Sequence, residues 1–196
     1  MSKHDLRYQI CVSGAARGDS IATGKELASE VAREIVRRSH LVVTGATRGL
    51  PYFAAIAAKI EGGHDITSIG FSPAASRLAH VKKYQLPLDV FDTVIFTGFE
   101  YTGRNLLLVR SCDAMVMVGG RIGTLNELTI GIEERKPIGI MLGSGGMTDE
   151  VEHVLKAAKR ARTGIIFDTD PVALVDQLID LIETKSSKLP DPVPEV

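Results

Sequence analysis

The chain of 196 residues, 44% hydrophobic and 24% charged, has the size and composition of one globular domain, which we place at residues 1–185. Its formal net charge of −1 offers no basic surface to a polyanion, so we expect no nucleic-acid polymer as a partner. No apolar stretch approaches the roughly 20 residues that span a bilayer, and MSKHDLRYQ is no signal peptide, which predicts a cytoplasmic protein without a membrane partner.

Short apolar runs alternate with longer segments of helical periodicity along the whole chain. In chain order, strands are predicted at 9–14, 40–45, 66–72, 93–98, 114–120, 137–143 and 164–169, with helices near 20–38, 50–61, 103–111, 124–135, 147–161 and 171–185. Most of the strands are continuously apolar, which is typical of strands covered on both faces. The pattern therefore predicts an α/β fold: a doubly wound, mainly parallel, Rossmann-like sheet of about seven strands with helices on both faces.

Two segments interrupt this alternation. Residues 73–92 contain two prolines and a basic stretch, and they indicate a short helix and a loop that is a candidate for a mobile flap over a site. Residues 186–196 hold three prolines and little to bury, which predicts a disordered tail.

The cysteines and histidines indicate no metal site. Cys11 lies in an apolar run and Cys112 lies beside an aspartate, without a CxxC pattern, so we interpret both as buried free thiols. The five histidines are scattered along the chain, and none forms a zinc-ligand spacing.

Small residues follow four of the first five predicted strands. Because the carboxyl ends of parallel strands share one edge of a sheet, these loops are expected to meet around an oxygen-rich ligand. From the first two loops, the predicted nucleotide-binding residues are Ser13, Gly14, Gly45, Ala46, Thr47 and Arg48. The loops lack the G-x-G-x-x-G and G-x-x-x-x-G-K-[ST] patterns, which argues against NAD oxidoreductases and P-loop NTPases, and no cofactor is predicted.

The stretch VGGRIGTLNEL, residues 118–128, has two interpretations. In the first, Thr124 caps a helix and Glu127 completes a capping box, which requires no function. That interpretation leaves the glycines unexplained, since glycine costs conformational entropy unless the backbone needs it. In the second, the loop is a phosphate cradle with Glu127 close to whatever the phosphate carries. The predicted phosphate-binding residues are Gly119, Gly120, Arg121, Gly123 and Thr124.

Arg104 is the second catalytic candidate. It stands at the predicted start of the helix after the fourth strand, at the same sheet edge as the loop after the fifth. We therefore expect Arg104 to face Glu127 across the crevice.

These residues carry a resemblance to a known family. The stretch from Gly103-Arg104-Asn105 to Ala114, followed by VGGRIGTLNEL, resembles the R-(x)-…-PGGxGTxxE signature of LOG-type proteins. Those are cytokinin-activating phosphoribohydrolases, long mislabelled as lysine decarboxylases. The resemblance implies a homo-oligomer, dimer or tetramer, whose small-molecule ligand is a nucleotide or another phosphorylated compound. It also implies that Arg104 and Glu127 hydrolyse the N-glycosidic bond of a nucleoside 5′-monophosphate.

The chain departs from that signature at Val118, where the family has proline, and at Pro51, where it has methionine. In these departures it is similar to a wider superfamily of nucleotide-binding proteins that includes non-catalytic sensors and a molybdenum-cofactor carrier. A non-catalytic carrier of a nucleotide or phosphorylated cofactor is therefore the alternative prediction. Lysine decarboxylation is rejected, because nothing marks a pyridoxal-phosphate lysine.

Overall fold

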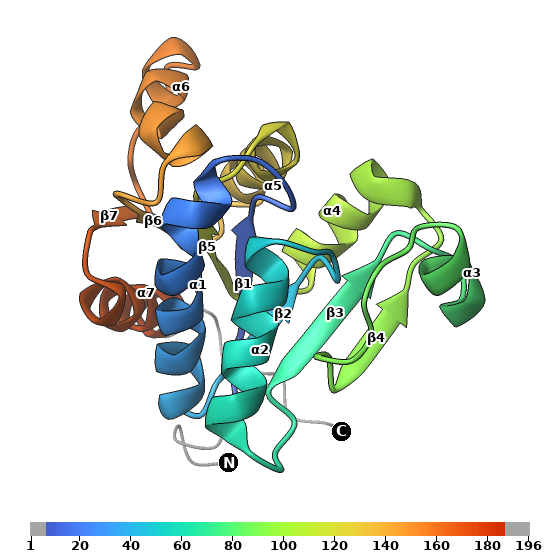
Figure 1. Cartoon of the computed structure of the whole chain (residues 1–196). Coiled ribbons are helices and arrows are strands. Elements are labelled where there is room, and N and C mark those ends of the chain that lie inside the picture. The colour runs from blue at the N-terminus through green and yellow to red at the C-terminus, as the bar shows by residue number, and fades with distance from the viewer. Residues whose placement is uncertain (1–6, 187–196) are drawn as a thin grey trace, which may run out of the picture.

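A computed structural model describes residues 7–186 (Figure 1). Its strands are β1 (Gln9–Gly14), β2 (Leu41–Thr44), β3 (Ser68–Ser72), β4 (Thr93–Phe96), β5 (Ala114–Val118), β6 (Ile138–Met141) and β7 (Ile165–Asp168). Its helices are α1 (Ser20–Arg37), α2 (Leu50–Gly62), α3 (Arg77–Lys82), α4 (Glu100–Arg110), α5 (Ile122–Glu133), the 3₁₀ helix η2 (Gly146–Glu150), α6 (Val151–Ala157) and α7 (Pro171–Ser186).

The strands form one seven-stranded sheet in the order β4-β3-β2-β1-β5-β6-β7, and every neighbouring pair is parallel. This confirms the predicted fold class. The strand order reverses direction between β1 and β5, where Gly14 lies in register with Val118. In open parallel sheets, ligands bind outside the carboxyl ends of the strands at such a reversal. The topology therefore brings the loops after β1 and β5 together.

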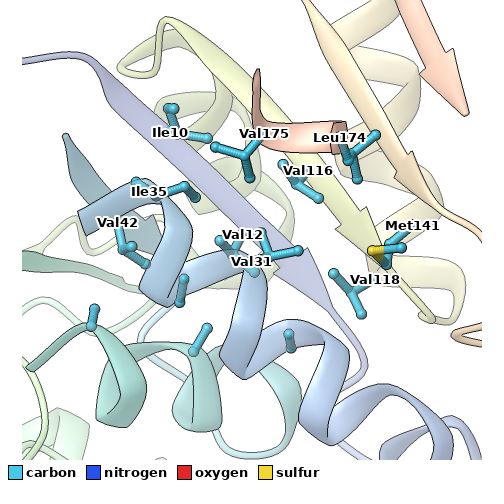
Figure 2. Packing of buried hydrophobic residues seen from close by; sticks show 14 of the residues in the cluster. Ile10, Val12, Val31, Ile35, Val42, Val116, Val118, Met141, Leu174 and Val175 are labelled. Carbon is cyan, nitrogen blue, oxygen red and sulfur yellow. The ribbon is translucent and has the colours of Figure 1, made fainter. Parts of the chain in front are cut away.

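Helices cover both faces of the sheet. Alternate residues of each central strand point to opposite faces, so each strand contributes side chains to both helix layers. Ile10 and Val12 of β1 pack with α1, α2 and α7, and Figure 2 shows Val31 and Ile35 of α1 against them. Cys11, between them in sequence, belongs to the second core with α4, α5 and α6. Continuous apolar strands are the consequence of this double burial.

The segment between β3 and β4 is held to the sheet by a buried histidine. His80 of α3 is fully buried, with its Nδ1 2.7 Å from the Ser72 hydroxyl and its Nε2 2.9 Å from the Pro87 carbonyl. The ring also lies edge-on to Phe96 of β4. The short helix and loop are as predicted, but these contacts argue against a mobile flap.

The two cysteines are free and buried, as predicted. A hydrogen bond with Cys112, together with burial, raises the pKa of the Cys11 thiol well above its ordinary value. No group of three or more potential metal ligands comes together within residues 7–186. None of the helices in that range combines the length and the apolar character needed to cross a membrane.

The described chain starts and finishes at the amino edge of the sheet. Arg7 precedes the first residue of β1 and donates to the Ser39 and Ile66 carbonyls, which lie just before β2 and β3. Helix α7 runs back from the carboxyl edge, and Lys185 near its end donates to the carbonyl of Arg135, which follows α5. The predicted tail, residues 186–196, lies outside the described residues except for Ser186, and the single-domain assignment stays a prediction.

Candidate functional site

A cavity of about 390 Å³ opens at the carboxyl edge of the sheet, where β1 and β5 end. This volume is within the range of about 300–1,000 Å³ that is typical of small-ligand sites. The sequence-predicted residues that line it are Ser13, Gly14, Gly45, Thr47, Arg104, Arg121, Gly123, Thr124 and Glu127. They come from four separate loops or helices, so the fold gathers residues that are more than 100 positions apart.

Glu127 on α5 lies in this cavity with its side chain only 9% exposed. Its Oε2 accepts a short hydrogen bond from the Ser13 hydroxyl on β1, and its Oε1 lies 3.3 Å from Nη1 of Arg104. The Asn105 amide, with its nitrogen turned toward the carboxylate, donates to Oε1 at 2.9 Å and to the Tyr101 carbonyl at 2.9 Å. Three different side chains therefore fix the orientation of one carboxylate.

Arg104 on α4 is buried beside Glu127, with a side chain 6% exposed. Its guanidinium lies directly on Gly45, where an added Cβ would be 1.8 Å from Nη1. Its Nε is buried and has no hydrogen-bond partner among the described residues. A buried donor without a partner costs roughly 1–3 kcal/mol. The site thus contains one donor whose hydrogen bond the folded chain does not supply.

The start of α5 differs from the capping-box prediction, which is wrong. The helix begins at Ile122 after an extended Arg121, and no side chain caps it. Thr124 lies inside the first turn and is buried, while Glu127 is engaged with Ser13 and Arg104 instead of the helix start. The first amides of a helix have no carbonyl partner within it, and this end carries partial positive charge. Since residues 122–124 line the cavity, these donors border it.

The glycines of the loop after β5 serve different purposes. Gly119 and Gly120 have φ angles of +58° and +110°, and a Cβ on Gly120 would lie 2.6 Å from Thr124. Both are outside the cavity lining, and the Gly119 amide donates to the Ser144 hydroxyl at 2.7 Å. Gly123 lines the cavity, has no positive φ, and an added Cβ there would meet nothing within 4 Å. Gly119 and Gly120 allow the left-handed backbone of the turn after β5, whereas the missing side chain of Gly123 leaves open space in the cavity.

The two remaining sequence-predicted residues lie away from this cavity. Ala46 is fully buried in a small core with Val90 and Phe91. Arg48 lines two adjoining cavities and donates from Nε to the Gln85 carbonyl at 3.2 Å.

Some lining residues were not predicted from the sequence. They are Val12, Ala15, Ala16, Arg17, Pro51, Tyr101, Asn105 and Ile122. Asn105 follows Arg104 in the motif and Arg17 belongs to the first glycine loop, so proximity to those motifs was the available signal. Nothing in the sequence marks Tyr101, which reaches the cavity because α4 begins at Glu100 and not at residue 103.

The parallel sheet and the cavity at its reversal point define an α/β protein of the Rossmann type with a candidate ligand site. More specifically, the chain belongs to the SLOG cluster4 family, whose model matches residues 7–175. The resemblance to LOG-type proteins is thus supported at the level of the SLOG family, and the narrower LOG assignment stays a prediction.

Individual proteins are also similar to this chain. An uncharacterized protein from Archaeoglobus fulgidus is 29% identical over 130 residues, which are 66% of this chain and 77% of that protein. The molybdenum cofactor binding protein from the phototrophic bacterium Rippkaea orientalis is similar in structure, with a TM-score of 0.71 and 21% identity over 93% of this chain and 99% of its own. At this identity the likeness shows a shared fold.

A third comparison corrects the expectation about nucleic acids. DNA processing protein A from Helicobacter pylori, which binds single-stranded DNA, matches with a TM-score of 0.61 and 16% identity over 90% of this chain and 82% of its own. A nearly neutral net charge therefore does not exclude a nucleic-acid partner for this fold, and our exclusion was wrong. Binding to single-stranded nucleic acid depends on the charge of a local groove and on aromatic surfaces that stack on bases, and the net charge of the whole chain measures neither.

Proposed function

We propose that the cavity binds a nucleoside 5′-monophosphate and that the protein hydrolyses its N-glycosidic bond, releasing a free base and ribose 5-phosphate. The observation that carries this proposal is the buried Arg104–Glu127 ion pair in the wall of the cavity. Both residues line the cavity, so the carboxylate of Glu127 would lie beside the sugar of a bound nucleotide, with the positive charge of Arg104 next to it.

The start of α5 is suited to the 5′-phosphate. The free amides of residues 122–124, the Thr124 hydroxyl and the Arg121 guanidinium border the same part of the cavity. Backbone amides and the positive end of a helix together favour a phosphate group. The open space next to Gly123 lets phosphate oxygens approach the backbone closely. Binding energy from this end positions the sugar over Glu127.

The chemistry requires a water oxygen to bond to C1′ while the C1′–N bond breaks and its electron pair leaves with the base. As C1′ gains oxocarbenium character, the Glu127 carboxylate stabilises the positive charge and orients the water. The proton released by the water ends on the departing base. Arg104 offsets charge on the base or holds Glu127 in place, and Ser13 and Asn105 fix the carboxylate. Electrostatic and acid–base contributions of this kind are worth about 10²–10⁴-fold in rate.

The test is a panel of nucleoside 5′-monophosphates incubated with the protein, with chromatography for released base. We expect base from at least one of them, and a loss of about 10²–10⁴-fold in turnover with Glu127→Gln. Glu134→Gln is the matched control, because it makes the same change at the end of α5, where Glu134 pairs with the exposed Arg110. Hydrolysis is refuted if no base appears with any nucleotide that binds.

The second candidate is a carrier of a phosphorylated cofactor or nucleotide. It is favoured by the structural likeness to the Rippkaea orientalis protein, which is described as binding molybdenum cofactor. It is also consistent with a Glu127 that is already hydrogen-bonded by protein groups. A carrier keeps its ligand affinity in Glu127→Gln and releases no base, whereas the enzyme keeps affinity and loses turnover.

A further inference from the structure

We infer that the site continues beyond the Glu127 cavity into a groove whose second part binds another nucleotide unit, so that the ligand class is a dinucleotide. This inference rests on the proposed function, which places the first unit beside Glu127. A second cavity of about 470 Å³ shares Ala16, Arg17, Thr47 and Tyr101 with the first. A third, of about 590 Å³, shares Arg48, Gln85 and Leu86 with the second. The three cavities thus adjoin along one groove.

The groove carries guanidinium groups that the protein leaves without a carboxylate. Arg17, Arg48 and Arg121 make no ion pair with any residue in the range 7–186, and Arg48 donates only to the Gln85 carbonyl. Most other arginines of the described chain pair with Glu or Asp. The linings of the second and third cavities contain no acidic residue. Unpaired guanidinium groups at both ends of the groove suit a ligand with a second phosphate.

Aromatic rings stand beside these cations. Tyr84 and Tyr101 both line the second cavity, with ring centroids 5.8 Å apart at an interplanar angle of 78°. Tyr52 and Phe53 both line the third, with centroids 6.1 Å apart. The hydroxyls of Tyr84 and Tyr52 donate to Glu100 and Asp89, which holds these two rings in place. Fixed aromatic surfaces next to an arginine are the usual means of stacking a nucleobase.

Arg48 links the two features, because it lines both the second and the third cavity. A phosphate on the far side of the first nucleotide would meet Arg48, and the base it carries would stack on the adjacent rings. A mononucleotide fills only the first cavity and makes no contact with Arg48. Affinity for a dinucleotide, but not for a mononucleotide, should therefore depend on this side chain.

The experiment measures binding by isothermal titration calorimetry in the Glu127→Gln background, so that no ligand is consumed. The probes are AMP, the 5′-phosphorylated dinucleotide pApA, diadenosine diphosphate and a 5′-phosphorylated deoxyadenosine dodecamer. We expect at least one dinucleotide to bind about tenfold more tightly than AMP, and Arg48→Ala to remove that gain while AMP affinity is unchanged. Arg77→Ala is the control, because Arg77 is an exposed arginine on α3 that lines none of the three cavities.

The outcomes separate this inference from the proposed function. If AMP binds and neither dinucleotide binds more tightly, or if Arg48→Ala weakens AMP equally, the second subsite does not exist. A dodecamer that binds ten times more tightly than pApA also overturns the inference, because the groove would then follow a polymer. If a dinucleotide binds through Arg48 while no mononucleotide binds or is hydrolysed, the subsite stands and the proposed function fails.

Discussion

Replacing Gly45 with alanine tests the placement of Arg104 directly. Gly45 has no positive φ, so its backbone accepts an alanine without strain. The new methyl group, however, would lie 1.8 Å from Nη1 of Arg104 and 2.7 Å from its Cζ. Ordinary van der Waals contact begins at 3.4 Å, so the guanidinium must retreat by the difference, about 1.6 Å.

That displacement exceeds what the hydrogen bond to Glu127 tolerates. The Nη1–Oε1 distance is already 3.3 Å, and a separation of 3.6 Å is no longer a hydrogen bond. Breaking a buried ion pair costs about 3–5 kcal/mol when one charge is left unpaired. Glu127 keeps its bonds to Ser13 and Asn105, so we expect Gly45→Ala to lower the free energy of unfolding by about 2 kcal/mol.

The assay is urea denaturation of four proteins: the wild type, Gly45→Ala, Arg104→Ala and the double variant. If the clash with Arg104 is the cause, Gly45→Ala costs about 2 kcal/mol in the wild type and close to nothing in the Arg104→Ala background. The slope of unfolding against urea should not change. An equal loss in both backgrounds would show that the methyl group disturbs something other than Arg104.

Three further outcomes are expected. Gly123→Ala should raise the free energy of unfolding by about 0.5–1 kcal/mol, because the site is helical and open, yet weaken AMP binding severalfold in calorimetry. His80→Ala should lower the free energy of unfolding by about 2–4 kcal/mol in urea denaturation, since one buried hydrogen bond, one partly buried hydrogen bond and a buried ring are lost; a loss under 1 kcal/mol would contradict the anchoring role of His80. Burial acts to raise the pKa of Asp92, but hydrogen bonds from the N–H groups of Thr67 and Ser68 outweigh burial and lower that pKa. The ionised Asp92 carboxylate therefore stabilises the fold above about pH 3.9, the unfolded pKa, and this stabilisation is lost as the pH falls through the pKa of Asp92 in the folded protein. The difference in unfolding free energy between wild type and Asp92→Ala should accordingly shrink in acid.

The sheet was predictable because its signal is local. Each strand is a short apolar run, and the predicted β1, Gln9–Gly14, has the bounds that the structure shows. Double burial makes such runs continuous, and the intervening helices require the strands to be parallel. The helix starts were less predictable. Helix α4 begins at Glu100, a non-glycine residue with a φ of +54°, and no propensity rule selects that residue for a helix start.

The partners of Glu127 were the least predictable part of the site. Thr124 is three residues from Glu127 in the sequence, and this spacing predicts a capping box that the structure does not contain. In the fold, Ser13 reaches Glu127 from 114 positions away and Arg104 from 23, and these contacts replace the local one. The register of β1 against β5 decides this competition, and only the assembled sheet reveals it. The same holds for the two cavities that Arg48 lines, whose walls come from four separate segments, 16–17, 47–53, 81–87 and Tyr101.

The position of the described chain's two ends has a practical consequence. Arg7 and Ser186 lie at the amino edge of the sheet, a full strand length from the groove at the carboxyl edge. A tether at Arg7 or at Ser186 would leave the groove facing away from a sensor chip. Surface-immobilised protein should therefore give the same association rates for AMP and pApA whichever end is tethered, so real-time kinetics of both ligands can be recorded on one orientation and checked on the other.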